Sequence, residues 1–306
     1  MIRKTATSLP NVFTVDVEDY FHVASFAGQI SPDDWDQYEC RVEANTHRIL
    51  ELAAKHGVRG TFFVLGWVAD RYPELVVDIR DAGHEIGSHS YWHQLIYEQG
   101  PERFREDLIR SRDLLQDITG DAVTLFRAPS FSVTKKSLWA LDILVEEGFR
   151  VDSSVYPVRH DRYGIPDAEI TPHEVTTESG SIIEFPGTVC TLGGMNVPVG
   201  GGGYFRLFPW WLMRRFLSRV NKQRQFNFYI HPWEVDPDQP RLNGPWKSRF
   251  RHYQNLKTTE TKLNYLLSSF ELGTMSEALQ QLGFNVGPQE SVPATIPVST
   301  TRGSEQ

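Results

Sequence analysis

Two histidines, His89 and His93, follow a short apolar segment and stand four residues apart. If the chain after Ser88 turns as a helix does, residues at this spacing lie on one face, and both imidazoles can bind the same ion. Such a pair is weak evidence by itself, because surface and core histidines also occur at this spacing. The pair is therefore one half of a candidate metal site, and the other half must come from elsewhere in the chain.

Ionisable residues also follow other apolar segments that read as strands. They are Asp16, Glu18 and Asp19 after the first segment, Arg127 after the fourth, Asp152 after the fifth and His231 after the last. Two imidazoles and one carboxylate form a three-ligand site with an open position for water, as a catalytic zinc ion requires. A second carboxylate can take a proton from that water, and a separate histidine can protonate a leaving amine. This set of residues predicts metal-assisted hydrolysis.

The elements that would position these residues alternate between strand and helix patterns. Strand patterns cover residues 11–17, 59–66, 84–89, 122–126, the segment 149–154 that carries Asp152, 181–185 and 225–230. Helical periodicity covers residues 34–56, 72–82, 101–118, 134–148, 209–220 and 258–282. This alternation predicts a parallel β/α sheet or barrel. In such folds the loops at the carboxyl ends of the strands converge on one ligand.

A glycine-rich segment, residues 200–206, interrupts the pattern. It lacks the Lys-Ser/Thr pair of a phosphate-binding loop and does not open a helix with Gly-x-Gly-x-x-Gly. We expect a flexible loop that borders a substrate groove.

The composition narrows the class of protein. The chain has 31 basic and 39 acidic residues and a net charge of −8, which argues against a general nucleic-acid or anionic-membrane binder but leaves room for a local basic patch. Cys40 and Cys190 are far apart, which indicates two reduced thiols rather than a disulfide framework or zinc ribbon.

The basic N-terminus lacks the apolar run of an export signal, and no stretch approaches the roughly 18 to 20 apolar residues of a membrane span, so we expect a cytoplasmic protein. The predicted organisation is an N-terminal extension (1–10), one domain (11–286) and a flexible tail (287–306).

Several ordered motifs resemble one family. They are Thr-Val-Asp-Val-Glu-Asp at 14–19, Gly-Thr-Phe-Phe-Val-Leu-Gly at 60–66, His-Glu-Ile-Gly-Ser-His at 84–89 with His93, Arg-Ala-Pro at 127–129, Asp-Ser-Ser at 152–154, and His231. Their order resembles the NodB-homology domain of carbohydrate esterase family 4, the polysaccharide deacetylases. The Val-Asp-Val-Glu-Asp-Tyr-Phe opening and the Gly- and Trp-rich C-terminal third are similar to a subgroup found with exopolysaccharide and exosortase loci. The resemblance spans roughly residues 13–283.

The resemblance implies a distorted, incomplete (β/α) barrel and the removal of an N-acetyl group from an amino sugar. In this family Asp16 would be the general base, oriented by Arg127, and His231, held by Asp152, would be the general acid. His89 and His93 would bind a divalent ion, with zinc the first choice, together with one acid of the first motif. A backbone N–H near Ser130 would stabilise the oxyanion.

The first motif departs from the family, whose members mostly have two adjacent aspartates. Along a strand Asp16 and Glu18 share a face while Asp19 points away, so we favour Glu18 as the third ligand, with Asp19 as the rival if the strand has already turned. A branch of the superfamily acts without metal on cyclic or urea-like substrates, so metal dependence is an expectation.

Four further residues are candidate substrate contacts: Trp92, Trp233, Tyr204 and Arg206. The two tryptophans stack on a sugar ring or pack over the barrel mouth. The expected partner is an N-acetylated saccharide, in a polysaccharide, an oligosaccharide or a lipid-linked precursor touched peripherally, and nucleic acid is not expected. The alternatives are a deformylase or other amidase of the same superfamily and a catalytically silent carbohydrate-binding barrel.

Overall fold

The structure is a computed structural model that describes residues 10–287, so nearly all of the predicted N-terminal extension and tail lies outside the described residues. The main sheet of the described chain has nine strands in the order β10-β1-β2-β3-β4-β5-β7-β6, with β11 paired to β1, and β8 and β9 form a separate two-stranded sheet. Every pairing in the main sheet is parallel except that of β6 with β7. The strands are β1 (Asn11–Val17), β2 (Thr61–Val64), β3 (Glu85–Ser88), β4 (Leu125–Phe126), β5 (Val151–Asp152), β6 (His173–Thr176), β7 (Ser181–Glu184), β10 (Asn227–Ile230) and β11 (Leu272–Gly273).

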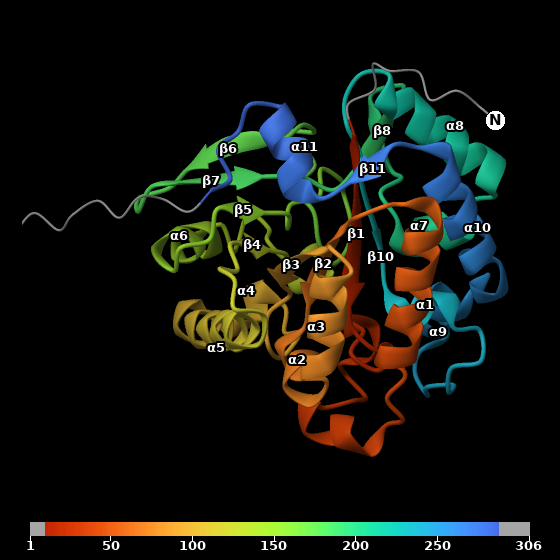
Figure 1. Cartoon of the computed structure of the whole chain (residues 1–306), viewed down its shortest axis with the longest axis horizontal. Helices are drawn as coiled ribbons and strands as arrows, with labels where there is room; N and C mark the ends of the chain where they lie inside the picture. The colour runs from red at the N-terminus through yellow and green to blue at the C-terminus, as the bar shows by residue number, and fades with distance from the viewer. Residues whose placement is uncertain (1–9, 288–306) are drawn as a thin grey trace, which may run out of the picture.

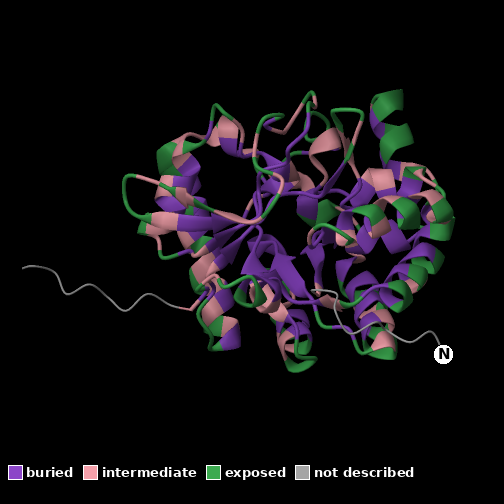
Figure 2. Ribbon diagram, turned by 90° about the horizontal axis from the view of Figure 1, so that it is seen from above, coloured by how far each residue is buried: buried purple, intermediate pink, exposed green. Residues whose placement is uncertain are grey.

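The sheet curls into an open barrel, which confirms the predicted fold class (Figure 1). Figure 2 shows the buried strands at the centre, with exposed residues on the surrounding helices and loops. The edge strand β10 is covered by residues 188–201: Thr188 exchanges hydrogen bonds with the backbone of Asn227, and Gly201 bridges Tyr229.

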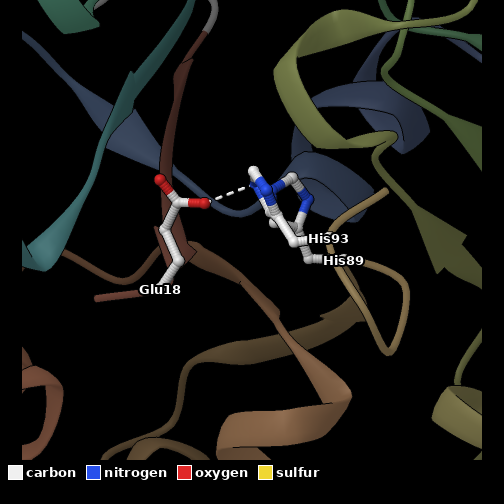
Figure 3. A group of neighbouring side chains, drawn as sticks. All are labelled: Glu18, His89 and His93. Atoms are coloured by element: carbon white, nitrogen blue, oxygen red, sulfur yellow. Dashed lines mark ion pairs between the residues drawn. The ribbon is translucent and has the colours of Figure 1, made fainter. Parts of the chain in front are cut away.

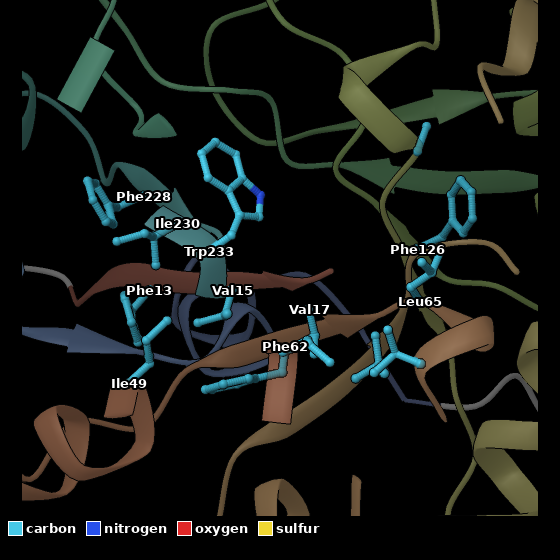
Figure 4. Packing of buried hydrophobic residues seen from close by; sticks show 14 of the residues in the cluster. Phe13, Val15, Val17, Ile49, Phe62, Leu65, Phe126, Phe228, Ile230 and Trp233 are labelled. Atoms are coloured by element: carbon cyan, nitrogen blue, oxygen red, sulfur yellow. The ribbon is translucent and has the colours of Figure 1, made fainter. Parts of the chain in front are cut away.

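Alternation along β1 separates the outer core from the barrel interior. Phe13, Val15 and Val17 point outward and pack with residues of the covering helices such as Ile49 (Figure 4). These helices include α1 (Val42–His56), α2 (Gly66–Arg71), α3 (Pro73–Asp81), α5 (Pro101–Thr119) and α6 (Trp139–Glu146). The residues between them, Thr14 and Asp16, point inward.

Helix α11 (Met275–Gln281) fills the interior at the amino ends of the strands, where Met275 and Leu279 pack in one cluster with Val12. Apolar packing thus occupies one end of the barrel. Polar side chains gather at the carboxyl ends of the strands, as expected for this fold.

The remaining elements are α4 (Ile96–Gln99), the hairpin β8 (Val189–Leu192) and β9 (Met195–Pro198), α7 (Gly202–Leu207), α8 (Trp210–Asn221), α9 (Trp246–Tyr253), α10 (Leu256–Ser269) and four short 3-10 helices, η1 (Ala24–Phe26), η2 (Pro32–Gln37), η3 (Pro129–Phe131) and η4 (Pro232–Val235). Within residues 10–287, the helices are too short or too polar to cross a bilayer.

Three predicted elements differ from the structure. The helix predicted at 134–148 begins only at Trp139. The helix predicted at 34–56 begins only at Val42, because Asp19 caps it there and Pro32–Gln37 forms a separate 3-10 helix. The loop predicted at 200–206 contains helix α7, and its glycines allow close packing rather than flexibility. Gly201 has φ +144°, and a Cβ atom there would lie 1.9 Å from the carbonyl oxygen of Tyr229.

Candidate active site

Glu18, His89 and His93 converge at the carboxyl ends of the strands. Their candidate ligand atoms all lie within 4.8 Å of one another, and all three side chains are buried (Figure 3). Nε2 of His93 is 2.5 Å from Oε2 of Glu18. Nδ1 of His89 donates a hydrogen bond to the carbonyl oxygen of Arg127 at 2.8 Å, so Nε2 is the nitrogen that carries a lone pair. The trio is a candidate metal site.

The helical turn predicted after Ser88 does not form. Residues 89–95 are a loop in which Ser90 and His93 have positive φ angles of 64° and 52°, and this conformation brings the two imidazoles together. Asp107 of α5 fixes the loop by accepting hydrogen bonds from the backbone N–H groups of Tyr91 and Trp92 at 2.8 and 2.9 Å. The two histidines therefore meet through a loop with two positive φ angles and not through a helical turn.

Asp19, the rival ligand, lies apart from the trio. Its Oδ2 accepts hydrogen bonds from the backbone N–H groups of Arg41 and Val42 at 2.6 and 2.8 Å. This carboxylate therefore caps α1, which leaves Glu18 as the acid of the candidate metal site.

Asp16 lies beside the trio and is held by Arg127. The Arg127 guanidinium is completely buried and donates hydrogen bonds from Nη1 to Asp16 Oδ1 and Thr14 Oγ1, both at 2.7 Å. Its remaining donors reach Ser153 and Asn227. One carboxylate oxygen of Asp16 is thus fixed by the arginine, while Oδ2 faces His231 at 3.8 Å.

His231 is held by Glu234 and not by Asp152, which corrects the role given to Asp152 from the sequence. Nδ1 of His231 donates to Oε1 of Glu234 at 2.7 Å, and the backbone N–H of His231 donates to the same oxygen at 3.1 Å. Arg206 in turn donates from Nε to Oε2 of Glu234 at 2.6 Å. Because Nδ1 is occupied, Nε2 of His231 points toward Asp16 and Glu18, at 3.8 and 3.7 Å.

Asp152 has partners of its own. It accepts a hydrogen bond from Ser154 and interacts with Glu184, whose Oε1 accepts from the backbone N–H of Val155 at 3.0 Å. Burial first, and then the negative charge of Asp152, raise the pKa of Glu184 well above its usual value. The two carboxyl groups therefore share a proton at neutral pH and act as a structural pair.

The surroundings of the two histidines His89 and His231 shift their pKa values in opposite directions. Burial opposes ionisation of Glu18, but the electrostatic interactions with His93 and His231 outweigh it and hold the pKa of Glu18 below its usual range. Burial lowers the pKa of His89 to about 4, which keeps this imidazole neutral and able to bind a metal ion. Burial would also lower the pKa of His231, but Glu18, Glu234 and Asp16 raise it to about 9, so that this imidazole is protonated at neutral pH.

A cavity of about 590 Å³ opens beside His231. Ser130 and Tyr204 line it, and their contact with a substrate stays a prediction. Trp233 also lines it but is nearly buried, and its indole N–H donates to Oε1 of Glu18 at 3.1 Å, which makes it a support for the carboxylate.

Two predicted substrate contacts are used differently. Arg206 touches the cavity, yet it is buried and its donors go to Glu234 and to the backbone of His252. Trp92 is not among the residues that line the cavity, and its ring packs near Trp35, with centroids 6.0 Å apart.

Sequence reasoning missed Glu234 and Asp107. A signal existed for each. Glu234 follows His231 and Pro232 at the spacing of a capping box, and the structure forms that box. Asp107 lies in the apolar stripe of a predicted helix, between the buried residues Phe104 and Ser111.

Two segments of the chain match known families. Residues 33–145 match the family model described as polysaccharide deacetylase, and residues 153–280 match a domain of unknown function, DUF3473. The first segment contains His89, His93 and Arg127, and the second contains His231 and its partner Glu234. The candidate site thus combines both matched segments with β1.

Curated relatives match part of the chain. It is 30% identical over 133 residues to a peptidoglycan deacetylase of Helicobacter pylori, covering 44% of each chain. It is 32% identical over 98 residues to a peptidoglycan-N-acetylglucosamine deacetylase of Bacillus cereus, covering 32% of this chain and 36% of the relative. The chain therefore spans less than half the length of these curated relatives.

Solved structures share the fold over nearly the whole chain. A crystal structure from Mycobacterium smegmatis, of a protein assigned to the polysaccharide deacetylases, superimposes with a TM-score of 0.57 at 19% identity, covering 92% of this chain and 93% of that one. The Bc1960 peptidoglycan N-acetylglucosamine deacetylase has a TM-score of 0.50 at 16% identity, covering 90% of each chain.

Proposed function

Since residues 33–145 match the polysaccharide deacetylase family and part of the chain is similar to peptidoglycan deacetylases, we propose that the protein is a metal-dependent hydrolase of carbohydrate esterase family 4 that removes N-acetyl groups from an amino sugar. Arg127 positions Asp16 as a base, and Glu234 positions His231 as an acid. The proposal depends on the observation that this base and this acid lie beside the trio Glu18, His89 and His93. A site that only binds a saccharide has no need for this pair.

The donor set of the trio fits a divalent ion. It offers two imidazole nitrogens and one carboxylate oxygen, and the buried Oε2 of Glu18 contacts Nε2 of His93, itself a member of the trio. Glu18, His89 and His93 would hold the ion, with zinc the first candidate. A bound ion of this kind polarises a carbonyl oxygen and lowers the pKa of water.

The protein's own residues then handle the protons of amide hydrolysis. Asp16, fixed by Arg127, accepts a proton from the attacking water through Oδ2. His231 donates the proton on Nε2 to the departing sugar nitrogen as the carbon–nitrogen bond breaks, and Glu234 steadies the imidazole through Nδ1. The products are acetate and a free amino sugar.

The substrate proposed is an N-acetylated saccharide, a polymer or a lipid-linked precursor. The curated relatives are named for peptidoglycan, which makes N-acetylglucosamine units the first to test. The association with exopolysaccharide loci and the cytoplasmic location stay predictions.

The test combines metal analysis of the purified protein with acetate release from a panel of N-acetyl sugars. Asp16→Asn is expected to abolish turnover and keep its metal content, while His47→Asn, a change at an exposed histidine paired with Asp78, is expected to change neither. Unchanged turnover in Asp16→Asn would overturn the mechanism. Release of formate instead of acetate would favour the alternative deformylase, and tight saccharide binding without turnover would favour a silent barrel.

A further inference from the structure

The cavity beside His231 has an unusual charge. The residues that line it include the basic side chains Arg162, Arg206, Lys247 and Arg251, but no aspartate or glutamate, although the whole chain has a net charge of −8. One of these cations, Arg206, is already neutralised by Glu234. The cavity therefore has a positive wall that the deacetylation chemistry does not use.

The three other cations have weak partners among the described residues. Arg162 donates one hydrogen bond to the hydroxyl of Ser25 at 3.0 Å. Arg251 lies 3.8 Å from Asp161, and both side chains are more than half exposed, so this ion pair is weak. Lys247 has a cation–π contact with Trp246 at 5.9 Å, and within residues 10–287 its ammonium group has no ion-pair partner. Each cation is thus available to a ligand.

Aromatic rings accompany the cations at the mouth of the cavity. Trp246 and Phe250 stand four residues apart on α9, are 73% and 58% exposed, and line the same cavity as Lys247 and Arg251. Exposed rings of this kind offer flat amphipathic surfaces to a sugar. The volume of about 590 Å³ falls in the usual range of ligand pockets and holds more than the single acetamido group that reacts.

We propose that this end of the cavity is a subsite for an anionic group, and that the substrate is an N-acetylated saccharide bearing a phosphate or a carboxylate outside the reacting sugar. Arg162, Lys247 and Arg251 bind the anion, and the rings of Trp246 and Phe250 contact the intervening sugar. The proposal rests on the proposed function for the position of the reacting acetamido group. A saccharide is favoured over a membrane surface because the cations line a cavity that leads to His231 rather than a flat face.

The test is calorimetric binding of three probes to the full-length, metal-loaded protein: an N-acetylglucosamine tetrasaccharide, the same chain phosphorylated at its reducing end, and the same chain oxidised to a carboxylate at that end. At least one acidic probe is expected to bind about tenfold or more tightly than the neutral one, and this preference is expected to shrink as salt is raised. The two acidic probes show which anion the subsite prefers.

Variants locate the anion site. In Lys247→Gln and Arg251→Gln, alone and together, the ratio of acidic to neutral affinity is expected to fall about tenfold. Arg249→Gln, an exposed change on the same helix outside the cavity, should keep the ratio. The exposed side chain of Lys247 makes that variant safe for folding.

Three outcomes overturn the proposal: equal affinity for all probes, an equal effect of Arg249→Gln, or binding to phosphatidylglycerol vesicles without preference for the acidic saccharides. Because binding is measured without turnover, the two proposals fail separately. Acid-selective binding without acetate release refutes only the deacetylase, whereas acetate release without acid selectivity refutes only the subsite.

Discussion

Replacing Glu234 by glutamine tests whether this residue, rather than Asp152, prepares His231 as the acid. The change keeps the shape of the side chain but removes the negative charge that accepts from Nδ1 of His231 at 2.7 Å. A hydrogen bond to a charged group is worth about 1.5–3 kcal/mol, which corresponds to about 1–2 units of pKa. From the value of about 9, the pKa of His231 is expected to fall to about 7–8.

The consequence is a shift of the alkaline limb of kcat/KM, which reports ionisation of the free enzyme. For a fall in pKa from about 9 to about 7.5, the protonated fraction at pH 8.5 drops from roughly 0.8 to roughly 0.1. The raised pKa keeps His231 charged at neutral pH, so activity in the variant is lost at lower pH than in the wild type. A metal ion bound by Glu18 would weaken the contribution of this carboxylate to the raised pKa of His231 in both proteins. The quantity to measure is therefore the difference in the pKa of His231 between wild type and variant.

The assay is acetate release between pH 6 and 10 on protein of verified metal content, below the unfolding temperature of each variant. That precaution matters because Arg206 loses its buried partner, at a cost of about 3–5 kcal/mol in stability. The double variant Glu234→Gln/Arg206→Met removes both charges and should show the same shift. Asp152→Asn is the matched control and should leave the limb in place, since Asp152 pairs with Ser154 and Glu184. An unmoved limb in Glu234→Gln, or a moved one in Asp152→Asn, refutes the reasoning.

Three more predictions concern the metal, the carboxyl pair and the glycine-rich segment. Glu18→Gln is expected to lose most of the bound metal, which elemental analysis would show. Chelation should lower the melting temperature of the wild type, measured by calorimetry, much more than that of this variant. Equal metal content in both proteins would contradict the assignment. Glu184→Gln should fold with wild-type stability because its amide can donate to Asp152, whereas Glu184→Ala should lose about 1–3 kcal/mol in urea denaturation; equal losses would argue against a shared proton. Gly201→Ala should cost more than about 2 kcal/mol, because a Cβ atom would lie 1.9 Å from the Tyr229 carbonyl oxygen, and a variant of unchanged stability would show that the backbone can shift.

The sequence determined the elements with long, regular patterns. The apolar alternation of β1 and the periodicity of α5 predicted their bounds to within a residue, and the order of strand ends predicted that Asp16, His89 and Arg127 would meet. This works because parallel strands place their carboxyl ends at one edge, so that chain order alone brings these residues together.

Only the tertiary structure decided which polar groups are partners. His231 has two candidate carboxylates, and the turn after β10 gives it Glu234, while β7 brings Glu184 to Asp152. Asp19 likewise does not belong to the candidate metal site, because its carboxylate accepts hydrogen bonds from two backbone N–H groups at the start of α1. A buried side chain forms the bonds that offset its burial cost best. For Asp19 and Asp152 those partners, at the start of α1 and on β7, lie more than twenty residues away in the chain, where local patterns do not record them, whereas Glu234 lies only three residues from His231.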